Sequence, residues 1–124
     1  MIDPRLFELR VRTNPDLLRL AARNLMENAL HHSPAGGKVH CSLERDDGGV
    51  TIAIDDDGPG IPPEEMPHVT ERFFRGRFKA AIGSGLGLSI AELALDQAGA
   101  ALALQNRAEG GLSARIVLPK DLIV

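Results

Sequence analysis

The stretch that decides the fold is Val50-Thr51-Ile52-Ala53-Ile54-Asp55-Asp56-Asp57-Gly58-Pro59-Gly60-Ile61-Pro62. Its apolar residues alternate, so Val50, Ile52 and Ile54 share one face of a strand. Asp56 falls on that same face, where a carboxylate is costly to bury unless something donates hydrogen bonds to it. The glycines that follow let backbone come close to such a donor. The stretch therefore predicts a ligand site that recognises an N–H group, such as the exocyclic amine of adenine. The alternative is an acidic turn that closes a surface hairpin.

The composition is that of one globular domain with an aliphatic core. The 124 residues suffice for a single core, and the hydrophobic fraction of 44% and charged fraction of 25% are ordinary. The net charge of −3 argues against nucleic acid or an anionic membrane as a partner, so any phosphate binding has to be local. A single cysteine, Cys41, excludes an internal disulfide and fits a reducing compartment. No apolar run has the length that spanning a membrane needs.

Two long helices are predicted from their end signals and apolar stripes. The first begins at Asn14-Pro15-Asp16, which supplies a cap, a proline at the first helical position and an acid near the positive end of the dipole. It runs to about Ser33, and its stripe is Leu18, Ala21, Leu25 and Ala29. The second spans about residues 87–97 and is ended by Gly99. Its inward residues are expected to be Leu86, Ile90, Leu93 and Ala94.

Alternating apolar residues and turn signals predict the strands. In chain order these are expected at about 7–12, 39–43, 50–55, 101–106 and 113–118. Residues 58–86 form a long connection with a helical turn near 63–69, and connections of this length are usually functional or disordered. The order of elements predicts an α+β fold. We expect a two-layer α/β sandwich, in which a mixed, mostly antiparallel sheet of about five strands is covered on one face by about three helices.

Two asparagines mark the first helix. Asn24 and Asn28 are four residues apart and therefore lie on one helix face. Asparagine is a poor helix former, so two on one edge indicate a task. Amide oxygens can ligate Mg²⁺, which keeps most of its waters and takes few protein ligands. The alternative is a pair of solvated polar residues.

Two further motifs lie in and after the long connection. The run Glu71-Arg72-Phe73-Phe74-Arg75-Gly76-Arg77-Phe78-Lys79 offers cations that can meet phosphates and aromatic rings that can bury apolar surface. The alternative is a solvated basic loop with a small hydrophobic anchor. The run Gly83-Ser84-Gly85-Leu86-Gly87-Leu88 directly precedes a helix, whose free N–H groups and dipole favour phosphate oxygens. It is not a Walker A loop, because no Gly-Lys-Ser/Thr follows.

The four motifs, taken in order, resemble the N, G1, F and G2 boxes of bacterial sensor histidine kinases. These are Asn-x-x-x-Asn on a helix, Asp-x-Gly-x-Gly after a strand, Arg-Phe-Phe, and Gly-x-Gly-x-Gly before a helix. The resemblance covers about residues 5–119 and identifies the chain as similar to the catalytic and ATP-binding domain of the GHKL superfamily, with the Bergerat fold. It implies a single domain over residues 1–124 with a mobile ATP lid at about 62–84.

The resemblance also implies a role for each matching residue. Asp56 would accept the adenine amino group, with Gly58, Gly60 and Ile61 beside the base. Asn28 would bind Mg²⁺ that bridges the triphosphate. The residues expected to act in catalysis are Asn24, Asn28 and Arg75. The lid would contribute nucleotide contacts from Phe73, Arg75, Arg77 and Lys79, with Phe73 and Phe74 as its anchor. The glycine-rich run would contribute Gly83, Ser84, Gly85, Leu86, Gly87 and Leu88.

The chain departs from the family pattern at two positions after the second asparagine. Many members place a basic and then an aromatic residue there, whereas this chain has His31 and His32. By position, His31 would reach a phosphate with a charge that depends on pH, and His32 would replace the ring near adenine. The alternative for both is a capping or surface role.

Asn24 bears on the type of reaction. Relatives that hydrolyse ATP carry a glutamate there to activate water, and an amide cannot act as a general base. Glu27 lies about 100° around the helix from Asn24 and Asn28, so it is no clean substitute. The resemblance therefore implies phosphoryl transfer to a histidine rather than fast hydrolysis, by positioning and by charge neutralisation.

The phosphoacceptor is expected on a separate segment, since the family places it on a dimerising helix that precedes this domain. The chain is expected to be the cytoplasmic catalytic domain of a larger inner-membrane sensor. Its expected partners are ATP or ADP, the dimerisation and phosphoacceptor domain, and a response regulator through that domain. We expect no nucleic acid and no direct membrane contact. The alternative function is a GHKL nucleotide-binding module without histidine kinase activity, namely a slow ATPase, a serine kinase or a degenerate sensor.

Overall fold

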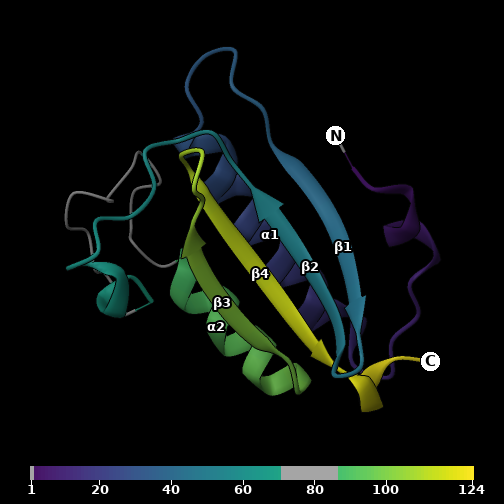
Figure 1. The fold of residues 1–124 in the computed structure, drawn as a ribbon. Helices are drawn as coiled ribbons and strands as arrows, with labels where there is room; N and C mark the ends of the chain where they lie inside the picture. The colour runs from purple at the N-terminus through teal and green to yellow at the C-terminus, as the bar shows by residue number, and fades with distance from the viewer. Residues whose placement is uncertain (1, 71–86) are drawn as a thin grey trace.

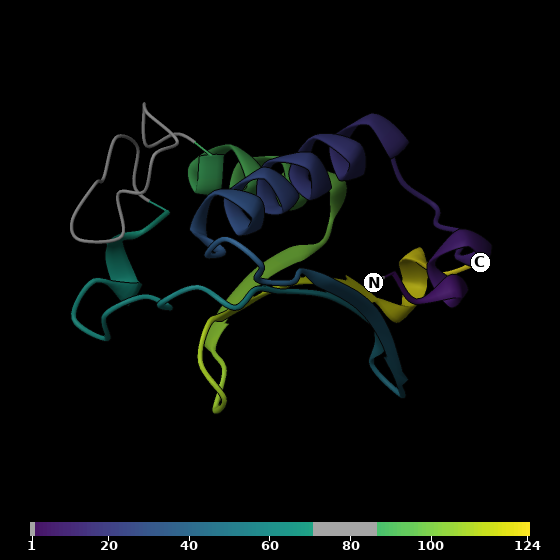
Figure 2. The same cartoon turned by 90° about the horizontal axis from the view of Figure 1, so that it is seen from above.

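The computed structural model describes residues 2–70 and 87–124, which form one sheet with helices on one of its faces (Figures 1 and 2). Its strands are β1 (His40–Asp46), β2 (Gly49–Asp55), β3 (Ala101–Asn106) and β4 (Leu112–Pro119). They pair antiparallel throughout, in the order β1-β2-β4-β3. The helices are α1 (Pro15–His32) and α2 (Gly87–Ala98). Figure 2 shows both on the same side of the sheet.

The fold class is confirmed, with counts that differ from those expected. The sheet of the described residues has four strands rather than five, and its α-helices are two rather than three. The described residues also form short 3-10 helices, which are η1 (Pro4–Glu8), η2 (Met66–His68) and η4 (Lys120–Leu122). The helical turn expected near residues 63–69 is the segment that contains η2.

The strand expected at 7–12 is wrong for most of its length. Asp3 caps η1 by accepting a hydrogen bond from the backbone N–H of Arg5, and a proline follows the cap at the first position. A proline there fixes a helical φ and needs no backbone donor, so the chain turns where alternation predicted extension. Within residues 7–12, strand-like pairing is limited to one isolated β-bridge, between Val11 and Ile123. This bridge draws the C-terminal tail against the N-terminal segment.

The first helix follows its end signals. Asn14 accepts a hydrogen bond from the backbone N–H of Asp16 at 2.9 Å, and the helix begins at the proline between them. Ser33 ends it with a backbone N–H that donates to Ala29. The predicted stripe of α1 is buried at Ala21, Leu25 and Ala29, and Leu18 is partly buried.

The prediction for the second helix is correct in its bounds and wrong for one residue that was expected to face inward. Leu93 is 59% exposed, whereas Ala91 and Leu95 are fully buried. Positions two apart in sequence are separated by about 200° around a helix. Because Ala91 and Leu95 face the core, Leu93, which lies two residues from each, faces solvent. Ala94 is buried as expected, Ile90 is partly buried, and Leu86 lies outside the described residues. Gly99 ends the helix at φ +82°, a conformation that favours glycine.

The core lies between the sheet and the helices. One face of the sheet supplies Cys41 and Leu43 from β1, Ile54 from β2, and Ala114, Ile116 and Leu118 from β4. Burial raises the pKa of the Cys41 thiol, which is consistent with an inert core cysteine. Neither α1 nor α2, the two α-helices of the described part, has the length and apolar character that crossing a membrane needs.

Candidate functional site

The candidate site begins with Asp56, the first residue after β2. Asp56 continues the core-facing row of β2 and is 2% exposed. Its Oδ1 accepts hydrogen bonds from the backbone N–H of Gly58 at 2.8 Å and of Leu112 at 3.1 Å. Its own backbone N–H donates to the carbonyl of Leu112 at 3.0 Å. Two fixed donors on one oxygen offset part of the cost of burying the carboxylate.

The other carboxylate oxygen of Asp56 is available to a ligand. Within residues 2–70 and 87–124, Oδ2 accepts no hydrogen bond and Asp56 forms no ion pair. The carboxylate of Asp56 is therefore oriented through Oδ1, while Oδ2 remains able to accept a hydrogen bond. Such an acceptor gains most from a ligand that brings an N–H group.

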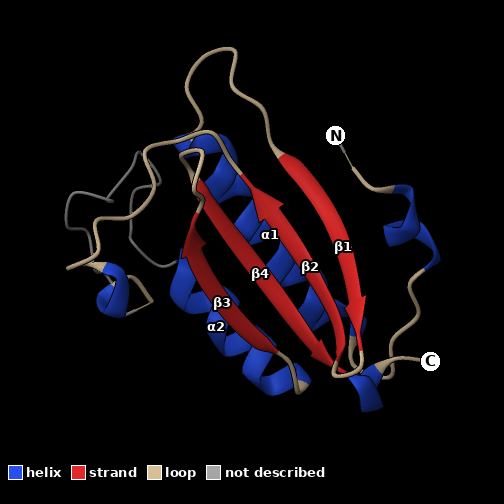
Figure 3. Ribbon diagram, viewed as in Figure 1, coloured by secondary structure: helices blue, strands red, loops and turns tan. Residues whose placement is uncertain are grey.

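Two glycines, Gly58 and Gly111, let the chain close around this carboxylate. A Cβ on Gly58 would stand 2.5 Å from the carbonyl oxygen of His32, at the end of α1. A Cβ on Gly111, which has φ +89°, would run into the carbonyl of Asp56. The glycines thus admit neighbouring backbone, and they bring the end of α1 and the start of β4 to the Asp56 loop (Figure 3).

The helix α1 carries both asparagines into this region, in different ways. Asn28 is 2% exposed, and its Oδ1 is buried without a hydrogen-bond donor in the part of the chain that the structure describes. Asn24 donates through Nδ2 to the carbonyl of Leu20 at 2.8 Å. Its Oδ1 is 3.8 Å from where a Cβ of Gly87 would be, so Asn24 faces the first residue of α2. Asn28 is the better candidate for a metal, because Mg²⁺ takes oxygen ligands and this oxygen is unsatisfied.

The two histidines after Asn28 differ in their surroundings. His31 is exposed. His32 is half-buried, and its Nδ1 lies 2.8 Å from the carbonyl oxygen of Asn28, so Nδ1 carries the hydrogen and donates. This contact ties the ring to the last turn of α1, as in the capping role that was the alternative for it. The same turn meets the Asp56 loop through the His32 carbonyl.

The structure brings together part of the predicted site. Where α1 ends, His32 contacts Asn28, and Gly58 lies against the His32 carbonyl and donates to Asp56. Where α2 begins, Asn24 lies close to Gly87. Leu88 is 5% exposed and belongs to the core. The remaining expected residues lie outside the described part of the chain: Phe73, Phe74, Arg75, Arg77, Lys79, Gly83, Ser84, Gly85 and Leu86. Most of the lid expected at about 62–84 lies there too.

Two residues at this site were missed by the sequence reasoning. The Asn106 side chain bonds both backbone groups of Ile61, and Arg107 Nη1 donates to the Asp56 carbonyl at 2.7 Å. Arg107 also contacts Asp57, 3.3 Å from its Oδ1. The pKa of Asp57 is lowered, chiefly by the backbone N–H of Lys38 and also by this guanidinium. In the sequence, Asn106 and Arg107 are marked only by their position before the glycine turn of the last hairpin, and this position does not indicate which residues they contact.

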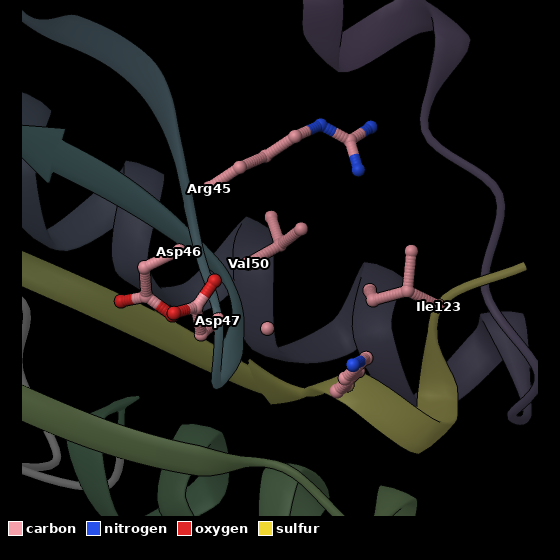
Figure 4. A pocket seen from close by; sticks show the side chains of 7 residues that line it. Arg45, Asp46, Asp47, Val50 and Ile123 are labelled. Atoms are coloured by element: carbon pink, nitrogen blue, oxygen red, sulfur yellow. The ribbon is translucent and has the colours of Figure 1, made fainter.

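Away from the Asp56 site, a cavity lies at the opposite end of β2, near the C-terminus. It has a volume of about 370 Å³ and is lined by Arg45, Asp46, Asp47, Gly49, Val50, Lys120 and Ile123. Figure 4 shows Arg45 reaching across it above Val50 and Ile123. The predicted nucleotide-site residues are absent from this lining, so it is a different place from the Asp56 site.

Comparison with known proteins decides the family. Residues 13–122 match the family described as "Histidine kinase-, DNA gyrase B-, and HSP90-like ATPase". The chain belongs to this ATPase family. Sensor protein QseC of Salmonella typhi is 40% identical over 100 residues, covering 81% of this chain and 21% of the relative. Sensor histidine kinase CpxA of Escherichia coli K12 is 37% identical over 109 residues, covering 86% and 23%. The chain thus spans about a fifth of the length of these relatives.

Solved structures agree with the family and confirm the fold. The mycobacterial sensor histidine kinase MprB has a TM-score of 0.77 and 38% identity, covering 88% of this chain and 74% of that one. The catalytic domain of histidine kinase ThkA has a TM-score of 0.76 and 26% identity, covering 89% and 70%. Full-length ShkA in complex with AMPPNP has a TM-score of 0.69 and 25% identity, covering 86% and 23%. The chain is thus similar to the catalytic, ATP-binding domain of sensor histidine kinases.

Proposed function

We propose that this domain binds Mg-ATP and transfers the γ-phosphoryl group to a histidine on a separate dimerisation domain of a two-component sensor kinase. The observation that carries the proposal is the buried Asp56 carboxylate, with one oxygen held by two backbone N–H groups and the other available. The names of the relatives support the reaction, and the AMPPNP complex of ShkA supports the ligand.

Asp56 would recognise the base. Adenine presents an exocyclic amine, and a charged acceptor at a fixed buried position pairs with it through a charge-assisted hydrogen bond. A guanine nucleotide presents a carbonyl oxygen at the same place, which a carboxylate repels. The base selectivity of the domain would therefore depend on Oδ2 of Asp56.

Asn28 would serve the phosphates. Its unsatisfied Oδ1 fits a Mg²⁺ ligand, and it sits one turn before the part of α1 that contacts the Asp56 loop. Bound Mg²⁺ supplies neutralisation of the charge that develops on the phosphate oxygens. Asn24, which faces the start of α2, would help to orient the phosphates from the other side.

The reaction would be a displacement at phosphorus. The imidazole nitrogen of the acceptor forms a bond to the γ-phosphorus, the bond to the bridging oxygen breaks, and ADP leaves. The Asn24 side chain supports transfer over hydrolysis, because an amide cannot take a proton from water. Glu27 offers no replacement, since it is exposed and pairs with Arg23 at 3.1 Å.

The test is calorimetric titration of the chain with ADP and a non-hydrolysable ATP analogue, with and without Mg²⁺, beside GTP. We expect micromolar, adenine-selective binding that depends on Mg²⁺. Addition of a histidine-bearing dimerisation domain and labelled ATP should then give acid-labile phosphohistidine. Label on serine, or release of phosphate without protein labelling, would favour the serine kinase or ATPase alternative. A cytoplasmic location below a membrane sensor, and a response regulator as the next acceptor, belong to the same proposal.

A further inference from the structure

The side chain of Asn106 clamps the backbone of Ile61. Asn106 is the last residue of β3, and its Oδ1 accepts from the backbone N–H of Ile61 at 2.8 Å. Its Nδ2 donates to the carbonyl oxygen of the same residue, also at 2.8 Å. An amide is a side chain that offers a donor and an acceptor together, so it satisfies both backbone groups of one residue. The clamp joins residues 45 positions apart.

The contact between Asn106 and Ile61 requires a glycine at position 60, for steric and conformational reasons. A Cβ on Gly60 would stand 2.7 Å from Asn106 Oδ1 and 3.3 Å from its Cγ. Gly60 also has φ +78°, in the left-handed region that side chains rarely adopt. The second glycine of the Asp-x-Gly-x-Gly motif is therefore needed here for the approach of a protein amide. The next residue, Ile61, is 2% exposed and packs in the core.

The neighbouring residue fixes the other end of the same loop. Arg107 Nη1 donates to the carbonyl oxygen of Asp56 at 2.7 Å, while Asn106 holds Ile61. Two consecutive residues thus hold the first and last residues of the loop 56–61. A loop held at both ends loses few conformations when a ligand binds, which lowers the entropic cost of binding.

We propose that Asn106 is a positioning residue for base recognition. By holding Ile61 against β3, it fixes the wall beside the base relative to the Asp56 carboxylate, and so sets the selectivity for adenine over guanine. The inference rests on the proposed function, because it names a further determinant of the same nucleotide site. Asn106 touches the loop backbone rather than the base, so its effect passes through the position of Gly60 and Ile61.

The test compares Asn106→Ala with the unaltered chain, by titration with ADP and with GDP. We expect the Kd for ADP to rise roughly tenfold, and the ratio of the GDP to the ADP dissociation constant to fall, because the loop relaxes. The matched control is Gln105→Ala. Gln105 is the adjacent residue and is exposed, its side chain points to the opposite side of the sheet, and that side chain makes no hydrogen bond within the described residues. Its variant should keep both constants.

A merely structural role would lower the melting temperature and leave the base ratio unchanged, which would overturn the inference. If Asn106→Ala does not fold, Asn106→Asp keeps the acceptor for the Ile61 N–H and should show a smaller shift in the same ratio. An unchanged ratio in that variant would also overturn it. If the unaltered chain binds neither nucleotide, the proposed function fails first, so the two failures are distinguishable.

A double-mutant cycle tests the contact itself. Gly60→Ala should destabilise the domain through its φ and through the clash with the Asn106 amide. In the Asn106→Ala background only the φ cost remains, so the two changes should be less than additive. Full additivity would mean that the amide does not occupy the space beside Gly60, which would contradict the clamp.

Discussion

Replacement of Asp56 by asparagine isolates the chemistry of one carboxylate oxygen, Oδ2. The amide oxygen of Asp56→Asn can still accept from the backbone N–H groups of Gly58 and Leu112, so the loop keeps its two hydrogen bonds. The position of Oδ2, however, becomes an NH₂ group. It then faces the adenine amine with another donor, and both are left unpaired in a buried place.

The magnitude follows from the two losses. A hydrogen bond to a charged group contributes about 1.5–3 kcal/mol, and an unpaired buried donor costs about 1–3 kcal/mol. A total of about 2.5–6 kcal/mol corresponds to a loss of affinity on the order of 10²- to 10⁴-fold for ADP. The variant should also bind inosine diphosphate better relative to ADP, because the carbonyl of that base accepts from the new amide.

The assay is calorimetric titration with ADP and inosine diphosphate, next to thermal unfolding. Asp55→Asn is the matched control, because this substitution makes the same chemical change one residue earlier, on the opposite face of β2. Its affinity for ADP should stay near that of the unaltered chain. If Asp56→Asn binds ADP within a few-fold of the unaltered chain while folded, the base is not recognised by this carboxylate and the reasoning is refuted.

Three other variants test separate parts of the structure. Asn28→Ala should weaken ADP binding more in the presence of Mg²⁺ than without it, measured by paired titrations; equal losses would argue against a metal role. Gly111→Ala should destabilise the domain to urea by more than the roughly 1–2 kcal/mol of left-handed strain, because its Cβ meets backbone, whereas Gly110→Ala at φ +107° has open space and should show the strain alone. The hydrogen bonds and charge of Arg5 lower the pKa of Asp3 from 3.8 to about 2, so the stabilisation is complete above about pH 4 and lost as the pH falls towards 2. Asp3→Asn should flatten that part of the stability profile, and an unchanged acid slope would contradict the pairing.

The predicted features that the structure confirms depend on local chemistry. The cap at Asn14, the stripe through Ala21 and Leu25, and the hairpin turns are set by residues close in sequence. The burial of Asp56 also followed from alternation along one strand. Short-range patterns of this kind can be read from one chain without knowledge of its partners.

The features that were missed depend on distant partners. Residues 7–12 alternate like a strand, but the capped turn before them and a bridge to the C-terminal tail decide their path. Leu93 is turned outward by the packing of its neighbours on α2. Asn106 and Arg107 are ordinary polar residues in sequence, and their role depends on a loop about 45 and 51 positions away. No pattern within a strand or a turn records such a pairing.

The pairing of Asp56 with Leu112 has a consequence for the order in which the domain is made. The carboxylate and its second donor are 56 residues apart, and β4, which carries that donor, is the last strand of the described chain. During synthesis, α1, β1 and β2 leave the ribosome long before this donor does. We therefore expect that a nascent chain cannot bind adenine nucleotides until the last hairpin has emerged, and that ATP cannot assist the folding of the earlier elements.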